Sequence, residues 1–365
     1  MDRRDFLRYS GIATTSIMYP MLAPPAFAQA SSGATPDQWR TFEVTTKVEV
    51  LKPLGITRVW VPTPLTQDTP FHKTLSNEFK AEGGTSGIVM EGKYGAGMVW
   101  AEWPDGVRPV LTHTTRFASR DIAVDWSKPS NPNPEDKAVL ARYTQATELM
   151  PTDGIVKKTA DDIVKGQRGN VAQARAIYEW IVDNTQRDPK TRGCGTGDIK
   201  FMLENNVLSG KCADLNALFV ALARAEGIPA RDVYGIRVAG SNLGYKSLGR
   251  TGGDITKAQH CRAEFYDPAY GWIPVDPADV RKVILEEDGG KKIDDPMVVA
   301  ARKRLFGSWE MNWLAYNYAH DLELPKATKG KVAFLMYPQS ETAEGRLDSL
   351  DPDNFKYTIS AKEIG

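Results

Sequence analysis

The hydrophobic pattern of this chain changes its period at a proline-rich stretch over residues 128–134 (KPSNPNP). Before this stretch apolar and polar residues alternate, as in residues 42–50 (FEVTTKVEV), which is the period of a half-buried strand. After it apolar residues recur three and four positions apart, as in residues 170–181 (NVAQARAIYEWI), which is the period of an amphipathic helix. The sequence therefore predicts an α+β fold in which a β part comes first.

The proline-rich stretch is the best-marked domain boundary. The predicted segments are a signal peptide over residues 1–28, an N-terminal β-sandwich domain over 37–128, a helix-rich domain over 134–290 and a C-terminal extension over 291–365 that packs on it. The sandwich is expected because strand-like runs occur at residues 57–61, 98–103 and 110–117. In the extension, Trp309, Trp313 and Tyr316 recur at helical spacing, which indicates a buried helix face or the wall of a binding groove. Strand-like runs near residues 332–337 and 355–359 are expected to cap a sheet.

Cys212 stands at the predicted start of a helix, within residues 209–214 (SGKCAD). Apolar residues then repeat with helical spacing over residues 215–222, and Gly227 with Pro229 supplies a stop. In a first helical turn the unpaired backbone N–H groups and the positive end of the helix dipole stabilise a thiolate, which lowers a cysteine pKa from about 8.5 toward neutrality. The position favours a reactive cysteine over a structural one.

A β-hairpin is predicted over residues 260–276 (HCRAEFYDPAYGWIPVD), with a turn near its middle. Antiparallel pairing around this turn places Asp276 opposite His260 or within about two residues of it. The competing carboxylate, Asp279, lies beyond Pro277, where the strand is expected to end. A cysteine, a base and an orienting carboxylate together indicate covalent acyl chemistry.

These residues also carry a family resemblance. The sequence GKCAD around Cys212, the histidine at the head of a strand and residues 270–277 (YGWIPVDP) resemble the motifs of the transglutaminase-like superfamily, in the order found there. The resemblance implies a papain-like core, with helices packed on an antiparallel sheet, in which Cys212 attacks an acyl carbon. It also implies that His260 handles the proton and that Asp276 orients the imidazole. Bacterial members include peptidases and amidases as well as cross-linking enzymes, so the substrate stays open.

An acyl intermediate needs a second oxyanion donor besides the backbone N–H of Cys212. Upstream amides that could supply it are Gln186, Asn205 and Asn206, although each also fits a surface loop. Members of the family often place an aromatic residue after the helix before the cysteine, whereas this chain has residues 184–189 (NTQRDP) there. Aromatic residues that line the site are therefore expected to come from another segment of the chain.

The N-terminus carries an export signal. Residues 3–8 (RRDFLR) match a twin-arginine motif, and a short apolar stretch leads to residues 26–28 (AFA), a small-x-small cleavage site. The mature chain is expected to begin near Gln29 and to reside in the periplasm. Since no later segment approaches about 20 apolar residues, it is expected to lack a membrane span.

Three cysteines in an exported chain leave one unpaired when the other two form a disulfide. This count fits a free Cys212 with a possible bridge between Cys194 and Cys261; the alternative is two further free thiols in a core. The cysteine and histidine spacings lack the paired motifs of a zinc site, so no metal and no cofactor are expected.

Lys plus Arg and Asp plus Glu both number 46, which gives no electrostatic reason to expect nucleic acid as a partner. The expected function is that of an exported thiol enzyme that hydrolyses peptide or amide bonds through a thioester on Cys212. A protein or peptide, with cell-wall peptides as natural candidates, is the expected substrate. The alternatives are a protein-cross-linking transglutaminase and a non-catalytic binding or assembly protein that keeps the scaffold.

Overall fold

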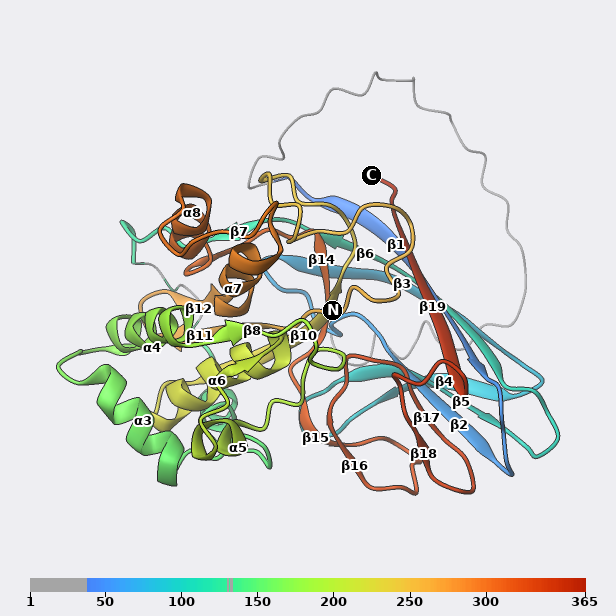
Figure 1. The fold of residues 1–365 in the computed structure, drawn as a ribbon. Helices are drawn as coiled ribbons and strands as arrows, with labels where there is room; N and C mark the ends of the chain where they lie inside the picture. Colours follow the sequence, from blue (N-terminus) through green and yellow to red (C-terminus); the bar gives the residue numbers. More distant parts are fainter. Residues whose placement is uncertain (1–37, 130, 132–133) are drawn as a thin grey trace, which may run out of the picture.

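The computed structural model describes residues 38–129, 131 and 134–365, so the predicted signal peptide lies outside the described residues. A helical part and a strand-rich part lie side by side, and the C-terminal segment runs from the first into the second (Figure 1). The described chain combines helices with several antiparallel sheets, and the predicted α+β fold is confirmed. None of the helices in the described ranges has the length and apolar character of a membrane span.

Two antiparallel sheets form the strand-rich part. The first has the order β19 (Phe355–Glu363), β1 (Arg40–Val50), β6 (Val110–Ser119) and β3 (His72–Glu82). The second has the order β18 (Arg346–Leu347), β17 (Gln339–Glu341), β2 (Thr57–Pro62), β5 (Gly97–Trp103) and β4 (Thr85–Met90). Val48, Val59, Val99, Leu111 and Phe355 from both sheets share one apolar core. The segments with alternating apolar residues therefore form a β-sandwich, in which the apolar face of each strand is buried between the two sheets.

The C-terminal segment completes this sandwich. Strand β19 pairs with β1 from Phe42 opposite Glu363 to Val50 opposite Phe355, and β17 pairs with β2 in the other sheet. Phe355 and Ile359 on β19 are buried, which agrees with the expectation that this run caps a sheet. Strand pairing thus distributes residues 291–365 over both parts of the molecule.

The helical part packs on a third antiparallel sheet. Its order is β12 (Gly271–Val275), β11 (Arg262–Asp267), β10 (Ala230–Arg237) and β14 (Trp313–Asn317). The longer helices are α3 (Gly154–Val164), α4 (Asn170–Asn184), α6 (Cys212–Ala225), α7 (Pro277–Glu286) and α8 (Pro296–Arg304). The remaining short elements are β7 (Ile122–Ala123), α2 (Lys137–Arg142), β8 (Gln186–Arg187), α5 (Ile199–Glu204), β9 (Ser209–Gly210), β13 (Ser308–Trp309), β15 (His320–Glu323) and β16 (Lys331–Phe334).

Helix α6 is the central helix of this part. All 14 of its residues are buried, because α3 and α4 pack against it as well as β10 and β11. A helix covered on several sides needs apolar residues all round, which explains why alanines fill the positions between its leucines. Since Cys212 is the first residue of α6, its side chain is held inside the molecule.

The helix expected from Trp309, Trp313 and Tyr316 is wrong, because these residues lie in or beside the strands β13 and β14. A spacing of four is ambiguous, since it also places two side chains on the same face of an extended segment. Trp309 and Trp313 use this face to pack edge to face, with ring centroids 6.0 Å apart. All three aromatic residues are buried, so the prediction that they belong to a core holds.

Candidate active site

The predicted hairpin forms as strands β11 and β12, in which Ala263 pairs with Val275. Continuing this register sets Asp276 opposite Arg262, so His260 lies two residues further along the facing segment. Side chains offset by two positions across neighbouring strands can reach each other. Oδ2 of Asp276 lies 2.7 Å from Nε2 of His260.

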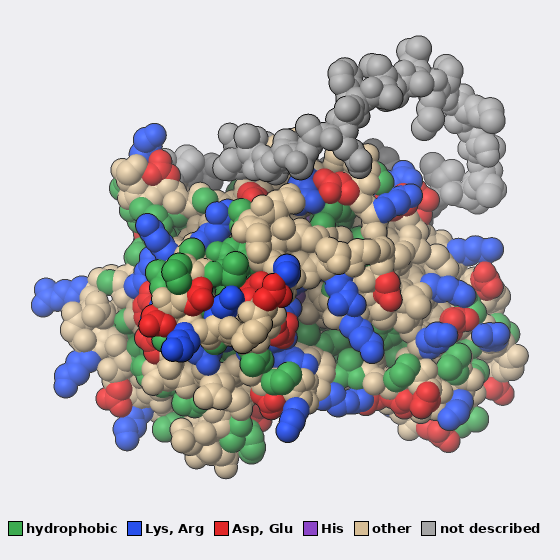
Figure 2. Space-filling model, turned by 45° about the horizontal axis from the view of Figure 1, so that its top comes forward, with side chains coloured by type: hydrophobic (Ala, Val, Ile, Leu, Met, Phe, Trp, Pro, Cys, Tyr) green, Lys and Arg blue, Asp and Glu red, His purple; other side chains and the backbone are tan. Residues whose placement is uncertain are grey.

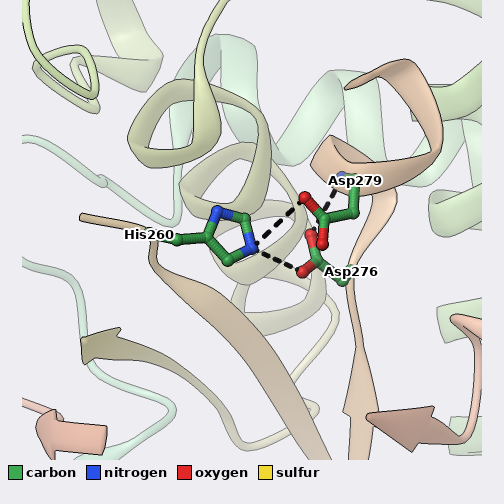
Figure 3. Close-up of side chains that lie close together, drawn as sticks. All are labelled: His260, Asp276 and Asp279. Carbon is green, nitrogen blue, oxygen red and sulfur yellow. Dashed lines mark hydrogen bonds and ion pairs between the residues drawn. The ribbon is translucent and has the colours of Figure 1, made fainter. Parts of the chain in front are cut away.

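The two nitrogens of the His260 imidazole have different surroundings. Figure 3 shows Nε2 facing the carboxylates of Asp276 and Asp279, whereas the other ring nitrogen points away from both. Nε2 is 2.7 Å from Oδ2 of Asp276 and 3.4 Å from Oδ1 of Asp279. Asp276 therefore accepts the hydrogen bond, and Nδ1 is left for a partner elsewhere.

Cys212 interacts with this imidazole, and the pKa of its thiol lies well below the ordinary cysteine value. Hydrogen bonds from the thiols of Cys194 and Cys261 are the largest cause; burial opposes them, and the hydrogen bond and charge of His260 lower the pKa further. The start of α6 acts in the same direction through the helix dipole. Cys212 and His260 are each only 4% exposed, which strengthens these interactions because little solvent screens them.

Asn216 connects the cysteine helix to the carboxylate. It lies one turn after Cys212, and its Nδ2 donates to Oδ1 of Asp276 at 3.1 Å and to the carbonyl of Cys261 at 2.8 Å. Asp276 is also the N-cap of α7, because Oδ1 accepts the backbone N–H of Asp279 at 3.0 Å. Burial raises the pKa of Asp276, and these donors together with His260 stabilise its ionised form.

All three cysteines are free and buried, so the possible bridge between Cys194 and Cys261 is not formed in this structure. Each of these two thiols instead lies within hydrogen-bonding reach of the Cys212 sulfur, and Sγ of Cys194 donates to the carbonyl of Gln259 at 3.3 Å. The loop that carries Cys194 is anchored there, since the N–H of Ala213 donates to the carbonyl of Cys194 at 2.9 Å. The count of cysteines predicted the free Cys212 but not this arrangement.

The C-terminal segment reaches the same cluster. The hydroxyl of Tyr337 hydrogen-bonds with the thiol of Cys194. The same hydroxyl would lie 3.0 Å from a Cβ atom added at Gly193. Leu350 packs beside the same glycine. Residues from the end of the chain therefore help to cover the loop that carries Cys194.

Asp214 fixes the loop before α6. Its Oδ1 accepts the N–H groups of Thr196 and Gly197, both at 3.0 Å, and its Oδ2 accepts the N–H of Lys211 at 2.9 Å. The loop approaches the carboxylate so closely that a Cβ on Gly195 would lie 1.9 Å from Oδ2. Gly195 also has a φ of +95°, a conformation that favours glycine.

Replacing Gly195 by alanine is expected to destabilise the protein by about 3 kcal/mol, because the close contact adds to the cost of the backbone conformation. Gly227 provides a matched control, since its φ is +75° but nothing lies within 4 Å of an added Cβ. Gly227→Ala is expected to cost only about 1 kcal/mol. Urea unfolding measures both values, and equal losses in the two variants would show that the contact with Asp214 is unimportant.

The amides predicted as oxyanion donors are not brought to the thiol. Gln186, Asn205 and Asn206 have exposed side chains, whereas Cys212 is buried. Nδ2 of Asn205 donates to the carbonyl of Phe201 at the end of α5. The backbone N–H of Cys212 remains suitable, because the first residues of a helix have no acceptor within it.

Three of the buried groups have a spacing that a metal ion could use, since ligand atoms of His260, Asp276 and Asp279 lie within 4.8 Å of one another. Both carboxylates already have positively charged side chains and hydrogen-bond donors as partners. Arg237 donates to both oxygens of Asp279 at 2.6 and 2.8 Å, and Nε of Arg262 lies 3.7 Å from Asp276. The donor set therefore fits proton transfer rather than metal ligation.

His320, another buried histidine, has different partners. Its Nε2 lies 3.2 Å from Asp232, and its Nδ1 lies 3.3 Å from the hydroxyl of Tyr234. Sequence reasoning did not find Arg237 or Asn216. Their distance from the hairpin along the chain gives no local signal, and only the packing of α6 and β10 brings them to the site.

The sequence profile of the transglutaminase-like superfamily matches residues 157–277, which include Cys212, His260 and Asp276. A protein of Haemophilus influenzae, described as uncharacterized, is 35% identical over 341 residues and covers 88% of this chain and 91% of its own length.

Among solved structures, a candidate cysteine protease from Cytophaga hutchinsonii is 16% identical, with a TM-score of 0.49, over 89% of this chain and 99% of that one. The periplasmic domain of TgpA from Pseudomonas aeruginosa bound to ethylmercury is 16% identical, with a TM-score of 0.34, over 62% of this chain and 90% of that one. The profile match names the family, and the sequence relative shows that the likeness to another bacterial protein extends over most of the chain. The chain belongs to the transglutaminase-like superfamily.

Proposed function

We propose that this protein is an exported cysteine enzyme that hydrolyses peptide or amide bonds through a thioester on Cys212. The observation that supports the proposal most is the His260 imidazole, whose Nε2 is hydrogen-bonded to Asp276 at 2.7 Å. This bond fixes the ring so that Nδ1 is directed away from the carboxylates (Figure 3). Since His260 also interacts with Cys212, we infer that Nδ1 exchanges a proton with the thiol. A nucleophile, a base and an orienting group then have the relation that acyl transfer needs.

In the proposed reaction the thiolate of Cys212 attacks the carbonyl carbon and forms a tetrahedral intermediate. The imidazolium of His260 donates its Nδ1 proton to the amine as the C–N bond breaks, which leaves a thioester. Water then attacks the thioester, its proton passes to Nδ1, and the acid leaves as the C–S bond breaks. Asp276 keeps its charge and holds the imidazole throughout.

Two opposite pKa shifts support this reaction. The pKa of Cys212 is lowered by its hydrogen bonds from Cys194 and Cys261 and by His260. Burial and the charge of Arg237 lower the pKa of His260, but the charges of Asp279 and Asp276 outweigh them and leave it raised. Thiolate and imidazolium therefore coexist between the two values, and we expect a bell-shaped dependence of activity on pH. The acid limb is the protonation of the thiolate, and the alkaline limb is the loss of the imidazolium proton.

The proposal includes export and a peptide substrate. The twin-arginine motif at residues 3–8 and the cleavage site at residues 26–28 support the periplasm as the compartment. A nucleophilic cysteine that is only 4% exposed suits an extended peptide or a side-chain amide better than the broad surface of a folded protein. We propose cell-wall peptides as substrates of this form.

We expect iodoacetamide at neutral pH to alkylate Cys212 fast and the other two cysteines slowly. Only the thiolate reacts, and the pKa of Cys212 is lowered whereas the pKa values of Cys194 and Cys261 are raised, the first by its hydrogen bond with Cys212 and the second by burial. Mass spectrometry of the digested protein at several pH values measures the rate for each cysteine.

The control is His260→Gln, in which the rate at Cys212 should fall at neutral pH because the imidazolium is lost. Labelling of Cys212 only at alkaline pH in the parent protein would contradict the proposal and favour a non-catalytic scaffold. If the alkylation rate of Cys212 is unchanged in His260→Gln, the thiolate does not depend on His260, and the proposed triad is contradicted.

A further inference from the structure

A second ion pair lies directly beside the His260–Asp276 pair. Arg237 at the end of β10 donates through Nη2 to both carboxylate oxygens of Asp279, at 2.6 and 2.8 Å. Its Nη1 donates to the carbonyl of Leu248 at 2.6 Å, which fixes the guanidinium from a second direction. Both side chains are buried, at 4% and 2% exposure, so this is an ion pair in a medium that screens poorly.

The pair is placed to act on the imidazole. Oδ1 of Asp279, one of the two oxygens that Arg237 binds, is 3.4 Å from Nε2 of His260 (Figure 3). Two buried carboxylates therefore face one nitrogen, and they would repel each other if both were ionised without cations. Arg237 neutralises Asp279, and Arg262 lies 3.7 Å from Asp276.

The charges that face His260 come from every element packed around it. They are Cys212 at the start of α6, Arg237 at the end of β10, Arg262 on β11, Asp276 after β12 and Asp279 on α7. With a thiolate and an imidazolium present, each negative group has a positive partner. Removing one charge therefore leaves its partner buried and uncompensated.

We propose that Arg237 and Asp279 are positioning residues for His260, forming a matched pair of charges that balances the imidazolium without binding substrate. Asp279 gives the protonated ring a second negative neighbour, and Arg237 holds that neighbour in place and partly offsets its charge. This inference rests on the proposed role of His260 as proton donor, and it deepens that role.

The two residues act on His260 in opposite directions. The charge of Arg237 lowers the pKa of His260, and the charge of Asp279 raises it. The pKa of Asp279 itself is depressed, because Arg237 and His260 outweigh the effect of burial. The two single variants should therefore move the titration of His260 in opposite senses, and the double variant should leave it close to its starting point.

The test is an NMR titration of the imidazole signals in the mature chain carrying Cys212→Ala, which removes the coupled thiol titration. The chain has four histidines, and His320→Gln assigns the signal of His320. His72 and His113 are separated from the others, since burial lowers their pKa values to about 3 and about 4.

In Asp279→Asn the pKa of His260 should fall, because Arg237 then faces the ring without a partner. In Arg237→Gln it should rise, and in the double variant it should return close to the parent value. Arg237→Lys keeps the charge and is the conservative control, which should leave the titration near that of the parent. With Cys212 restored, the alkylation rate at neutral pH should fall about tenfold in Asp279→Asn and recover in the double variant, as expected for a shift that favours the neutral thiol–imidazole form.

Loss of one partner of a buried pair also destabilises a protein, so each variant is checked by thermal unfolding before titration. The double variant keeps the test decisive, because it removes both charges and leaves none unpaired. Shifts of the same sign in the two single variants, or no shift in either, would overturn the inference. Slow alkylation of Cys212 in the parent protein would contradict the proposed function instead, so the two failures are distinguishable.

Discussion

Replacing Cys212 by alanine is expected to abolish turnover while leaving the fold intact. The thiolate is the only atom of the proposed site that bonds covalently to the substrate, and removal of a nucleophile typically lowers kcat by about 10⁴-fold or more. The structural cost is small, because alanine has a high helix propensity and the position is the first of α6. Release of new amino termini or of ammonia from periplasmic peptides measures the activity, and circular dichroism checks the fold.

Cys194→Ala is the matched control for this variant. It removes a buried thiol from the same cluster but not the nucleophile, although it also removes a hydrogen bond to the Cys212 sulfur. We expect activity to survive with its acid limb moved to higher pH. Full activity in Cys212→Ala would refute the thioester mechanism. Incorporation of an added amine by the parent protein, without new amino termini, would indicate cross-linking rather than hydrolysis.

The parts of the site that could be predicted from the sequence are those set by local structure. A helix start is marked by residues close together, which is why Cys212 could be placed in a first turn. A hairpin relates its two strands through one short turn, so His260 and Asp276 could be paired before their distance was known. Asp276 rather than Asp279 accepts the hydrogen bond, because it follows the strand directly.

The parts that could not be predicted depend on contacts between distant segments. Strand β19 pairs with β1 across almost the whole described chain, and the alternation of residues 355–359 does not name a partner strand. Spacing alone could not tell the strands that hold Trp309 and Trp313 from a helix. The cysteine count likewise could not show that Cys194 and Cys261 both contact Cys212, because a bridge and a cluster of free thiols need the same number of cysteines.

Replacing Asp276 by asparagine is expected to lower kcat by about 10⁴-fold, as when a buried triad carboxylate becomes an amide in a serine protease. Oδ2 of Asp276 now accepts a hydrogen bond from Nε2 of His260. An amide nitrogen at this place is a donor and requires Nε2 to be the acceptor, which moves the proton to Nδ1. Nδ1 then faces the thiol as a donor and cannot take its proton, so the thiolate is lost at neutral pH.

Asp276→Asn also distinguishes a catalytic role of the carboxylate from its role in stabilising α7. Asp276 caps α7, and asparagine is as good an N-cap as aspartate, so the cap to the N–H of Asp279 is retained. Asp295→Asn makes the identical change at the cap of α8, where Oδ1 accepts from Met297, and should leave activity unchanged. Asp276→Ala should lose about 1 kcal/mol more stability than Asp276→Asn, because it removes the cap as well. Equal activity in Asp276→Asn and Asp295→Asn would mean that the carboxylate serves only the helix, and His260 would then need another orienting group.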